Sequence, residues 1–181
     1  LRGGCYPVHA PLTFGPEDSA PVTYAAYPGE TPILDGGIAI TSWQVTTINE
    51  QAAWVADLPM FDGARLVPHQ LFMNGRRCSR TRLPKEGFYW ITGVQGEVQK
   101  GDFTGVLASD SFTVSPGDIK PWQNLTDVDV VALHYWIEER LPISTFDLAT
   151  NMVTSTRRST FGLKDDWADR WARYYVENVF E

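Results

Sequence analysis

An Asn-Gly pair at positions 74 and 75 constrains the fold of this chain more than any other feature. The pair favours a type I′ turn, because both central residues of that turn have positive φ, which Asn tolerates and Gly adopts freely. An apolar run precedes it and an alternating polar run follows, so residues 70–83 predict a β-hairpin. Burying an unpaired cation is costly, so the arginines of the outgoing arm must face water, a carboxylate or a ligand. They are Arg76, Arg77, Arg80 and Arg82.

The bulk composition predicts a globular protein and excludes some partners. The chain has 181 residues, of which 43% are hydrophobic, enough for one large or two small domains. A formal net charge of −7 disfavours nucleic acid. No run approaches the roughly 20 apolar residues that span a bilayer, so no membrane partner is expected. Cys5 and Cys78 are expected to be free thiols, although their pairing is left open, as is the redox compartment.

The punctuation of the chain predicts an all-β architecture in three parts. In residues 1–43, strands of three to six residues lie between Gly and Pro turns, which suits a parallel β-helix or a small sandwich. Residues 44–160 predict an antiparallel sandwich or barrel, with strands at 87–93 and 105–114 and a hairpin at 143–153. Residues 161–181 predict one short helix, Leu163–Arg173, with acidic residues in its first turn, followed by a strand.

Two groups of side chains are candidate ligand-binding residues. Alternation over residues 127–140 predicts one long strand, with His134, Trp136 and Glu138 on the same face. An indole stacks on a sugar ring while its polar neighbours bind hydroxyls, but a half-exposed sandwich strand explains the same pattern and is the favoured reading. The arginine group around Arg77 suits the carboxylate of a uronic acid, although salt bridges within the protein are again favoured.

Catalytic motifs are not recognisable in the sequence. Glycoside hydrolysis needs two carboxyl groups about 5–10 Å apart, and no motif marks any of the acidic clusters for that role. The three histidines lack metal-ligand spacing, so no metal site is expected. Nucleophile-elbow, phosphate-loop and dinucleotide motifs are absent from the sequence, so no cofactor is expected. The acidic clusters are Asp127/Asp129, Glu138/Glu139 and Asp165/Asp166/Asp169.

Several phrases, in their joint order, resemble glycoside hydrolase family 141 and its relatives. The early phrases resemble the first coils of right-handed parallel β-helix proteins, the middle ones a β-rich domain inserted into the helix, and the last one the return to it. They are Gly-Gly-Cys-Tyr, Pro-Leu-Thr-Phe-Gly-Pro-Glu-Asp-Ser and Thr-Tyr-Ala-Ala-Tyr-Pro-Gly-Glu-Thr-Pro-Ile-Leu-Asp-Gly-Gly; then Arg-Leu-Val-Pro-His-Gln-Leu-Phe-Met-Asn-Gly-Arg-Arg and Arg-Thr-Arg-Leu-Pro-Lys-Glu-Gly-Phe-Tyr; and finally Arg-Tyr-Tyr-Val-Glu-Asn-Val-Phe-Glu.

This resemblance implies a function that the residues alone do not. It implies part of a secreted or periplasmic glycoside hydrolase acting on xylan or fucosides of the plant cell wall, with opening β-helix coils at 1–43, an inserted domain at 44–160 and a return segment at 161–181. The remainder of the parent β-helix is then a partner, and the family's catalytic carboxylates map onto no residue here. The piece is expected to be accessory and carbohydrate-contacting. The alternatives are a stand-alone non-catalytic carbohydrate-binding module and a purely structural insertion.

Overall fold

The computed structural model describes residues 1–181 except 62, 67, 96–107, 166–169 and 181. The described residues form two compact units, Leu1–Pro68 and His69–Glu181, which we describe separately. The expected boundary between residues 43 and 44 stays a prediction.

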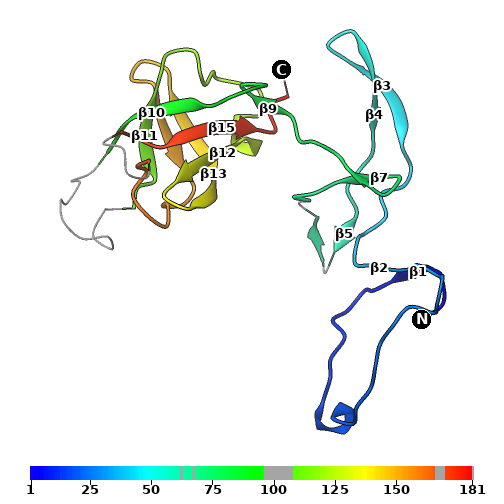
Figure 1. Cartoon of the computed structure of the whole chain (residues 1–181). Coiled ribbons are helices and arrows are strands. Elements are labelled where there is room, and N and C mark those ends of the chain that lie inside the picture. Colours follow the sequence, from blue (N-terminus) through cyan, green and yellow to red (C-terminus); the bar gives the residue numbers. More distant parts are fainter. Residues whose placement is uncertain (62, 67, 96–107, 166–169, 181) are drawn as a thin grey trace. The chain divides into compact units, whose positions relative to one another are not determined.

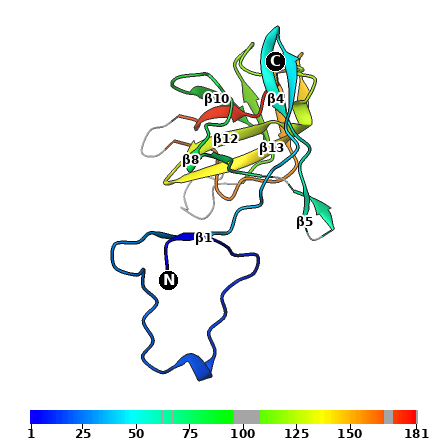
Figure 2. The ribbon, with the colours of Figure 1, turned by 90° about the vertical axis from the view of Figure 1, so that its right-hand side faces the viewer.

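The first unit consists of three small two-stranded sheets (Figures 1 and 2). Its only parallel pairing among the described residues joins β1 to β2, and Gly4 there lies opposite Pro32. The other two sheets are antiparallel hairpins, β3–β4 and β5–β6. The elements are β1 (Gly4–Pro7), the 3₁₀ turn η1 (Pro16–Asp18), β2 (Pro32–Asp35), β3 (Gln44–Ile48), β4 (Gln51–Val55), β5 (Met60–Phe61) and β6 (Ala64–Arg65).

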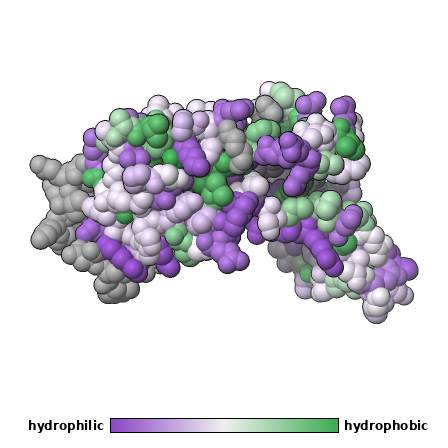
Figure 3. All heavy atoms as spheres, turned by 90° about the horizontal axis from the view of Figure 1, so that it is seen from above, coloured by the Kyte–Doolittle hydropathy of each residue, from purple (hydrophilic) through white to green (hydrophobic). Residues whose placement is uncertain are grey.

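The first unit has no buried core among the residues that the structure describes. Every side chain of known exposure between Leu1 and Pro68 is exposed or half-buried. Hydrophobic residues therefore reach the surface, as the green atoms in Figure 3 show. A chain segment without buried apolar area lacks the main term that offsets the conformational entropy of ordering it. The exposed large hydrophobic residues of this unit include Leu12, Phe14, Val22, Tyr24, Tyr27, Ile33, Leu34, Trp54 and Phe61.

The second unit begins with the hairpin predicted from Asn74-Gly75, which is confirmed. Strands β7 (Phe72–Met73) and β8 (Arg76–Arg77) pair in antiparallel fashion around the turn. Asn74 has a φ of 52° and Gly75 a φ of 73°, as a type I′ turn requires. Each arm is only two residues long, and within the described part of the chain β7 and β8 contact no other strand or helix.

The rest of the second unit is a closed barrel of six antiparallel strands in the order β10-β11-β14-β13-β12-β15, closed by pairing of β10 with β15 (Figure 1). The strand predicted at 87–93, the hairpin predicted at 143–153 and the final strand are confirmed. The barrel strands are β10 (Tyr89–Val94), β11 (Ser111–Val114), β12 (Asp129–His134), β13 (Ile137–Asp147), β14 (Met152–Ser155) and β15 (Arg173–Glu177), and the 3₁₀ turn η2 (Leu125–Asp127) precedes β12.

Alternating apolar residues of these strands fill the interior of the barrel. Val130, Val131 and Ala132 of β12 are all fully buried, so the alternation of one buried and one mixed face predicted over residues 127–140 is wrong for this strand. Pro142 lies where β13 stops pairing with β12 and starts pairing with β14. A proline is tolerated at such a point because no ladder bond needs its missing N–H. The core consists of Ile91, Phe112, Val114, Ile119, Val128, Val130, Ala132, Leu141, Ile143, Val153, Leu163, Ala172, Tyr174, Val176 and Val179.

The chain enters and leaves the barrel on neighbouring strands. The incoming strand β9 (Arg82–Leu83) pairs with the outgoing β15, continuing the edge along which β10 also pairs. Asn178 extends this contact, since its N–H donates to the carbonyl oxygen of Thr81 at 3.0 Å. The side-chain amide of Asn124 donates to the carbonyl oxygen of Asn178 at 2.7 Å and accepts from the N–H of Phe180 at 3.2 Å. The two ends of the barrel segment are therefore fastened together.

Three expectations need correction or limitation. The long strand over 127–140 is wrong, because the chain reverses between His134 and Ile137, which form a pair. The helix over 163–173 is wrong for its described residues, since Lys164 and Trp171 form an antiparallel bridge and β15 begins at Arg173; residues 166–169 lie outside the described part. A β-helix is not shown, as the only parallel sheet of the described chain is β1–β2.

Candidate functional site

The hairpin tip between β12 and β13 carries the most prominent aromatic side chain of the barrel. Tyr135 and Trp136 form the two-residue connection, and Tyr135 has a φ of 50°. Positive φ is uncommon for an aromatic residue, so the surrounding packing must hold this conformation. Trp136 is 62% exposed. Of the three residues predicted to share one strand face, Trp136 therefore presents its indole to solvent from a turn.

An aromatic cluster supports the exposed indole. The ring of Trp136 lies 5.6 Å from that of Phe161 and 5.8 Å from that of Tyr135, measured between centroids. Tyr135 and Phe161 also contact each other, with centroids 6.1 Å apart. These distances fall in the range preferred by aromatic pairs. We name Tyr135, Trp136 and Phe161 the aromatic platform. The contacts with Tyr135 and Phe161 support the exposed indole of Trp136 from the protein side.

Beneath the platform, His134 is buried in a polar network. Its Nδ1 lies 3.2 Å from the carbonyl oxygen of Gly162, and its Nε2 lies 3.2 Å from Oε2 of Glu139. Both partners of the ring nitrogens are oxygens, so Nδ1 donates to the carbonyl and one proton lies between Nε2 and the carboxyl group. His134 is 1% exposed. It therefore cannot touch a ligand and instead positions the turn above it.

Glu139 connects this network to the segment that carries Phe161. Its carboxylate accepts hydrogen bonds from the backbone N–H of Thr160 at 2.8 Å and from the Thr160 hydroxyl at 3.0 Å. The guanidinium of Arg157 lies 3.6 Å from Oε1 of Glu139. The Glu139 side chain is only 4% exposed, so these contacts act in a low dielectric. Sequence reasoning named Glu139 only as one of several acidic residues and missed this positioning role.

Glu138 points away from the platform into a surface ion-pair group. Its Oε1 accepts from Nη1 of Arg140 at 2.9 Å, and Nη2 of the same guanidinium lies 3.4 Å from Glu177. The Coulombic attraction of both carboxylates raises the pKa of Arg140 against the opposing effect of desolvation, so this side chain stays charged. Strand β13 thus carries Glu138 on the opposite face from the buried Glu139, and the predicted grouping of His134, Trp136 and Glu138 is not brought together.

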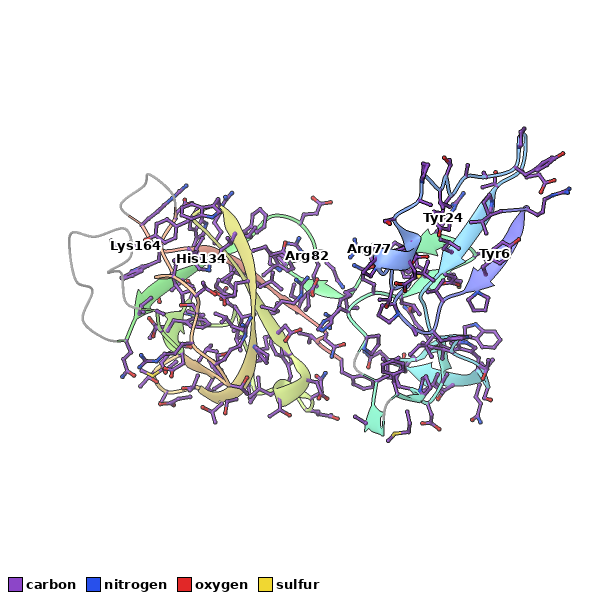
Figure 4. All side chains as sticks on the ribbon, turned by 90° about the horizontal axis from the view of Figure 1, so that it is seen from below. Tyr6, Tyr24, Arg77, Arg82, His134 and Lys164 are labelled. Carbon is purple, nitrogen blue, oxygen red and sulfur yellow. The ribbon has the colours of Figure 1, made fainter. Side chains whose placement is uncertain are left out.

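The arginines after the Asn-Gly turn separate into two kinds. Arg77 lies exposed on β8 (Figure 4). Arg80 lies 3.3 Å from Glu177 and 3.6 Å from Asp129. Arg82 donates to the carbonyl oxygen of Pro84 and its guanidinium lies 4.0 Å from the ring centroid of Tyr175. The expectation of salt bridges within the protein is confirmed for Arg80, whereas Arg82 contacts carbonyl oxygens and aromatic rings instead, and binding of a ligand by Arg77 stays a prediction.

A cavity of about 460 Å³, which sequence reasoning missed, opens at the same end of the barrel as His134. It is lined by Trp90, Ile91, Lys164, Arg170 and Trp171. The Arg170 guanidinium lies 4.1 Å from the ring centroid of Trp90, and the Lys164 ammonium 5.4 Å from that of Trp171. The presence of Lys, Arg and Trp side chains within residues 164–171 was the available signal. It was interpreted as a helix surface, while Trp90 is brought in only by sheet pairing.

No three His, Cys, Asp or Glu side chains of the described residues gather closely enough to hold a metal ion. Within the same residues no helix has the length and apolar character needed to cross a bilayer. Cys5 and Cys78 are free thiols.

The barrel end thus offers an exposed, supported aromatic platform and, beside it, a cavity with two indoles and two cations. This combination can stack on apolar ring faces and donate hydrogen bonds to oxygens. Comparison with protein families, with curated proteins and with solved structures found no match in any of the three.

Proposed function

We propose that this chain is an accessory, carbohydrate-contacting part of a glycoside hydrolase that acts on a plant cell-wall polysaccharide, xylan or a fucoside, outside the cytoplasm. The observation that carries the carbohydrate contact is the 62% exposed indole of Trp136 held by Tyr135 and Phe161. An aromatic ring that is exposed and supported by neighbouring rings offers a flat apolar face, and the C–H face of a sugar ring is a natural partner for it. The resemblance to family 141 supplies the polysaccharide class.

The finer architecture belongs to the same proposal. Gly4 pairs in parallel with Pro32, which lies 28 residues later, and one turn of a β-helix brings the chain back beside itself in this way. Leu1–Pro68 lacks buried side chains among its described residues, which supports opening coils that complete their core against further coils. The barrel begins and ends on the paired strands β9 and β15, as a domain inserted into another fold requires.

The same pairing of β9 with β15 favours the alternative of a purely structural insertion. That alternative predicts no polysaccharide binding at all, whereas a stand-alone carbohydrate-binding module predicts binding without any parent enzyme. Retention on insoluble xylan distinguishes binding from structure, and release of reducing sugar measures catalysis. We expect retention but no release, because the resemblance maps none of the family's catalytic carboxylates onto a residue of this chain.

The test of the proposal is Trp136→Ala, with Trp54→Ala as the matched control. Trp54 is 68% exposed in β4, so both substitutions remove an exposed indole. Loss of a stacking aromatic is expected to weaken binding to insoluble xylan by more than about 1 kcal/mol, roughly fivefold or more. Circular dichroism checks that the barrel remains folded. Equal retention of the wild type and both variants, or equal loss in both variants, refutes the role of the platform.

A further inference from the structure

We infer that the aromatic platform and the cavity beside it form two subsites for one oligosaccharide, so that the barrel binds a chain of sugars and not a single sugar. The inference rests on the proposed function and extends it from one residue to a site of defined extent.

Sheet pairing places the two features side by side. Leu133 of β12 lies opposite Arg173 of β15, and Trp90 of β10 lies opposite Arg173 on its other side. Tyr135 of the platform follows Leu133 by two residues, and Trp171 of the cavity precedes Arg173 by two residues. Because the two strands are antiparallel, both residues lie toward the same end of the pair. Trp171 in turn bridges to Lys164. The platform and the cavity therefore occupy the same end of the barrel, as the positions of His134 and Lys164 in Figure 4 show.

The cavity has the chemistry of a sugar subsite. Its volume of about 460 Å³ falls in the range of roughly 300–1,000 Å³ typical of small-molecule sites. Ile91, which is 3% exposed, and the indoles of Trp90 and Trp171 line the cavity and supply its apolar surface. The cations that lie over those indoles are donors without acceptor capacity, which suits the hydroxyl and ring oxygens of a sugar. Arg170 is also fixed by Asp165, at 2.8 Å between Nε and Oδ2.

A single backbone segment joins the two subsites. Phe161 belongs to the platform and Lys164 lines the cavity, and a chain spans at most about 3.6 Å per residue, so about 11 Å at most separates their Cα atoms. His134 fixes the start of this segment through the Gly162 carbonyl, and the N–H of Ala172 donates to the Leu163 carbonyl at 3.0 Å. Because the segment is held at both points, the two subsites lie close enough together for one oligosaccharide to bridge them.

The test measures affinity as a function of ligand length. Titration calorimetry compares xylobiose with xylohexaose for the wild-type chain, Trp136→Ala and Arg170→Gln, with Arg158→Gln as the control. Arg170 and Arg158 both have mainly exposed side chains, 57% and 71%, so neither change is expected to unfold the barrel. Loss of a charged donor that binds the ligand lowers the affinity ratio of xylohexaose to xylobiose about tenfold in Arg170→Gln. The ratio is unchanged in Arg158→Gln.

The outcomes separate this inference from the proposed function. If Trp136→Ala abolishes binding while Arg170→Gln leaves the length ratio at the wild-type value, the platform binds alone and the two-subsite inference is wrong. If the wild type binds neither ligand, the proposed function itself fails. A length ratio that falls in Arg170→Gln but not in Arg158→Gln supports both.

Discussion

Truncation of Glu139 to alanine is expected to destabilise the barrel strongly, whereas truncation of its neighbour Glu138 is not. The Glu139 carboxyl group shares a hydrogen bond with Nε2 of His134 and accepts from the N–H and hydroxyl of Thr160. Its side chain is 4% exposed, while that of Glu138 is 44% exposed. The two residues are adjacent in β13, so they differ mainly in burial and in the partners each would abandon.

The magnitude follows from what the truncation leaves behind. Without Glu139, the N–H of Thr160 and Nε2 of His134 each lose their hydrogen-bond partner inside the protein. Removing one partner of a buried pair costs about 3–5 kcal/mol, and a single unsatisfied buried donor costs about 1–3 kcal/mol. We therefore expect Glu139→Ala to lower the free energy of unfolding by about 3–5 kcal/mol. The pair between Glu138 and Arg140 is largely screened by water, so Glu138→Ala costs at most about 1 kcal/mol.

Urea unfolding of the whole chain, followed by circular dichroism, measures both values. The described residues of the first unit contain no buried core, so the cooperative transition reports on the barrel. Glu139→Gln preserves volume and part of the hydrogen bonding, and should lie between wild type and Glu139→Ala. A loss below about 1 kcal/mol for Glu139→Ala, or equal losses for the two alanine variants, would refute the role assigned to the network.

Three further predictions concern other parts of the chain. Burial raises the pKa of the Asp118 carboxyl, which accepts a hydrogen bond from the Tyr174 hydroxyl at 3.0 Å, so the stability that Asp118 contributes at acidic pH is lost as pH rises through that raised pKa. In urea titrations, the stability of Asp118→Asn relative to wild type should therefore increase from about pH 3 to pH 7. A difference that stays constant with pH would contradict this. Gly75→Val should disrupt the β7–β8 hairpin, because Val does not tolerate a φ of 73°. The unfolding transition of the barrel should stay unchanged, since within the described residues the hairpin contacts no other strand or helix. A large loss of barrel stability would show that the hairpin supports the barrel. Asn124→Ala should free the outgoing segment and speed amide exchange at Phe180, and unaltered exchange there would disprove the fastening.

Local turn chemistry was readable from the sequence only where the turn residues are specialised for it. Asn74 and Gly75 predict a turn because both residue types readily adopt positive φ. Tyr135 and Trp136 do not, so the alternation on either side of them was interpreted as one strand, although the chain reverses there. Of the aromatic platform, only Trp136 was therefore named as a candidate, and it was placed in a strand-face grouping that the fold does not produce.

Features that depend on distant pairing were beyond the sequence pattern. Barrel closure needs Tyr89 to pair with Tyr174, and no local signal distinguishes this from an open sandwich. The segment around Trp171 has charges and indoles at helical spacing, which favours a helix. The pairing of Trp171 with Lys164 and the start of β15 at Arg173 outweigh this local helix preference. The cavity was missed for the same reason, because Trp90 reaches it only through the sheet.

The adjacency of β9 and β15 has a mechanical consequence. Tension applied to the chain before Arg82 and after Glu177 acts across two antiparallel neighbours at the same end of the pair. The hydrogen bonds between them are then loaded one after another, as in unzipping, and not all together, as in shear. The contacts of Asn178 with Thr81 and of Asn124 with the outgoing segment are loaded first. The barrel is thus expected to open under low force from its fastened end, and Asn124→Ala to lower that force further.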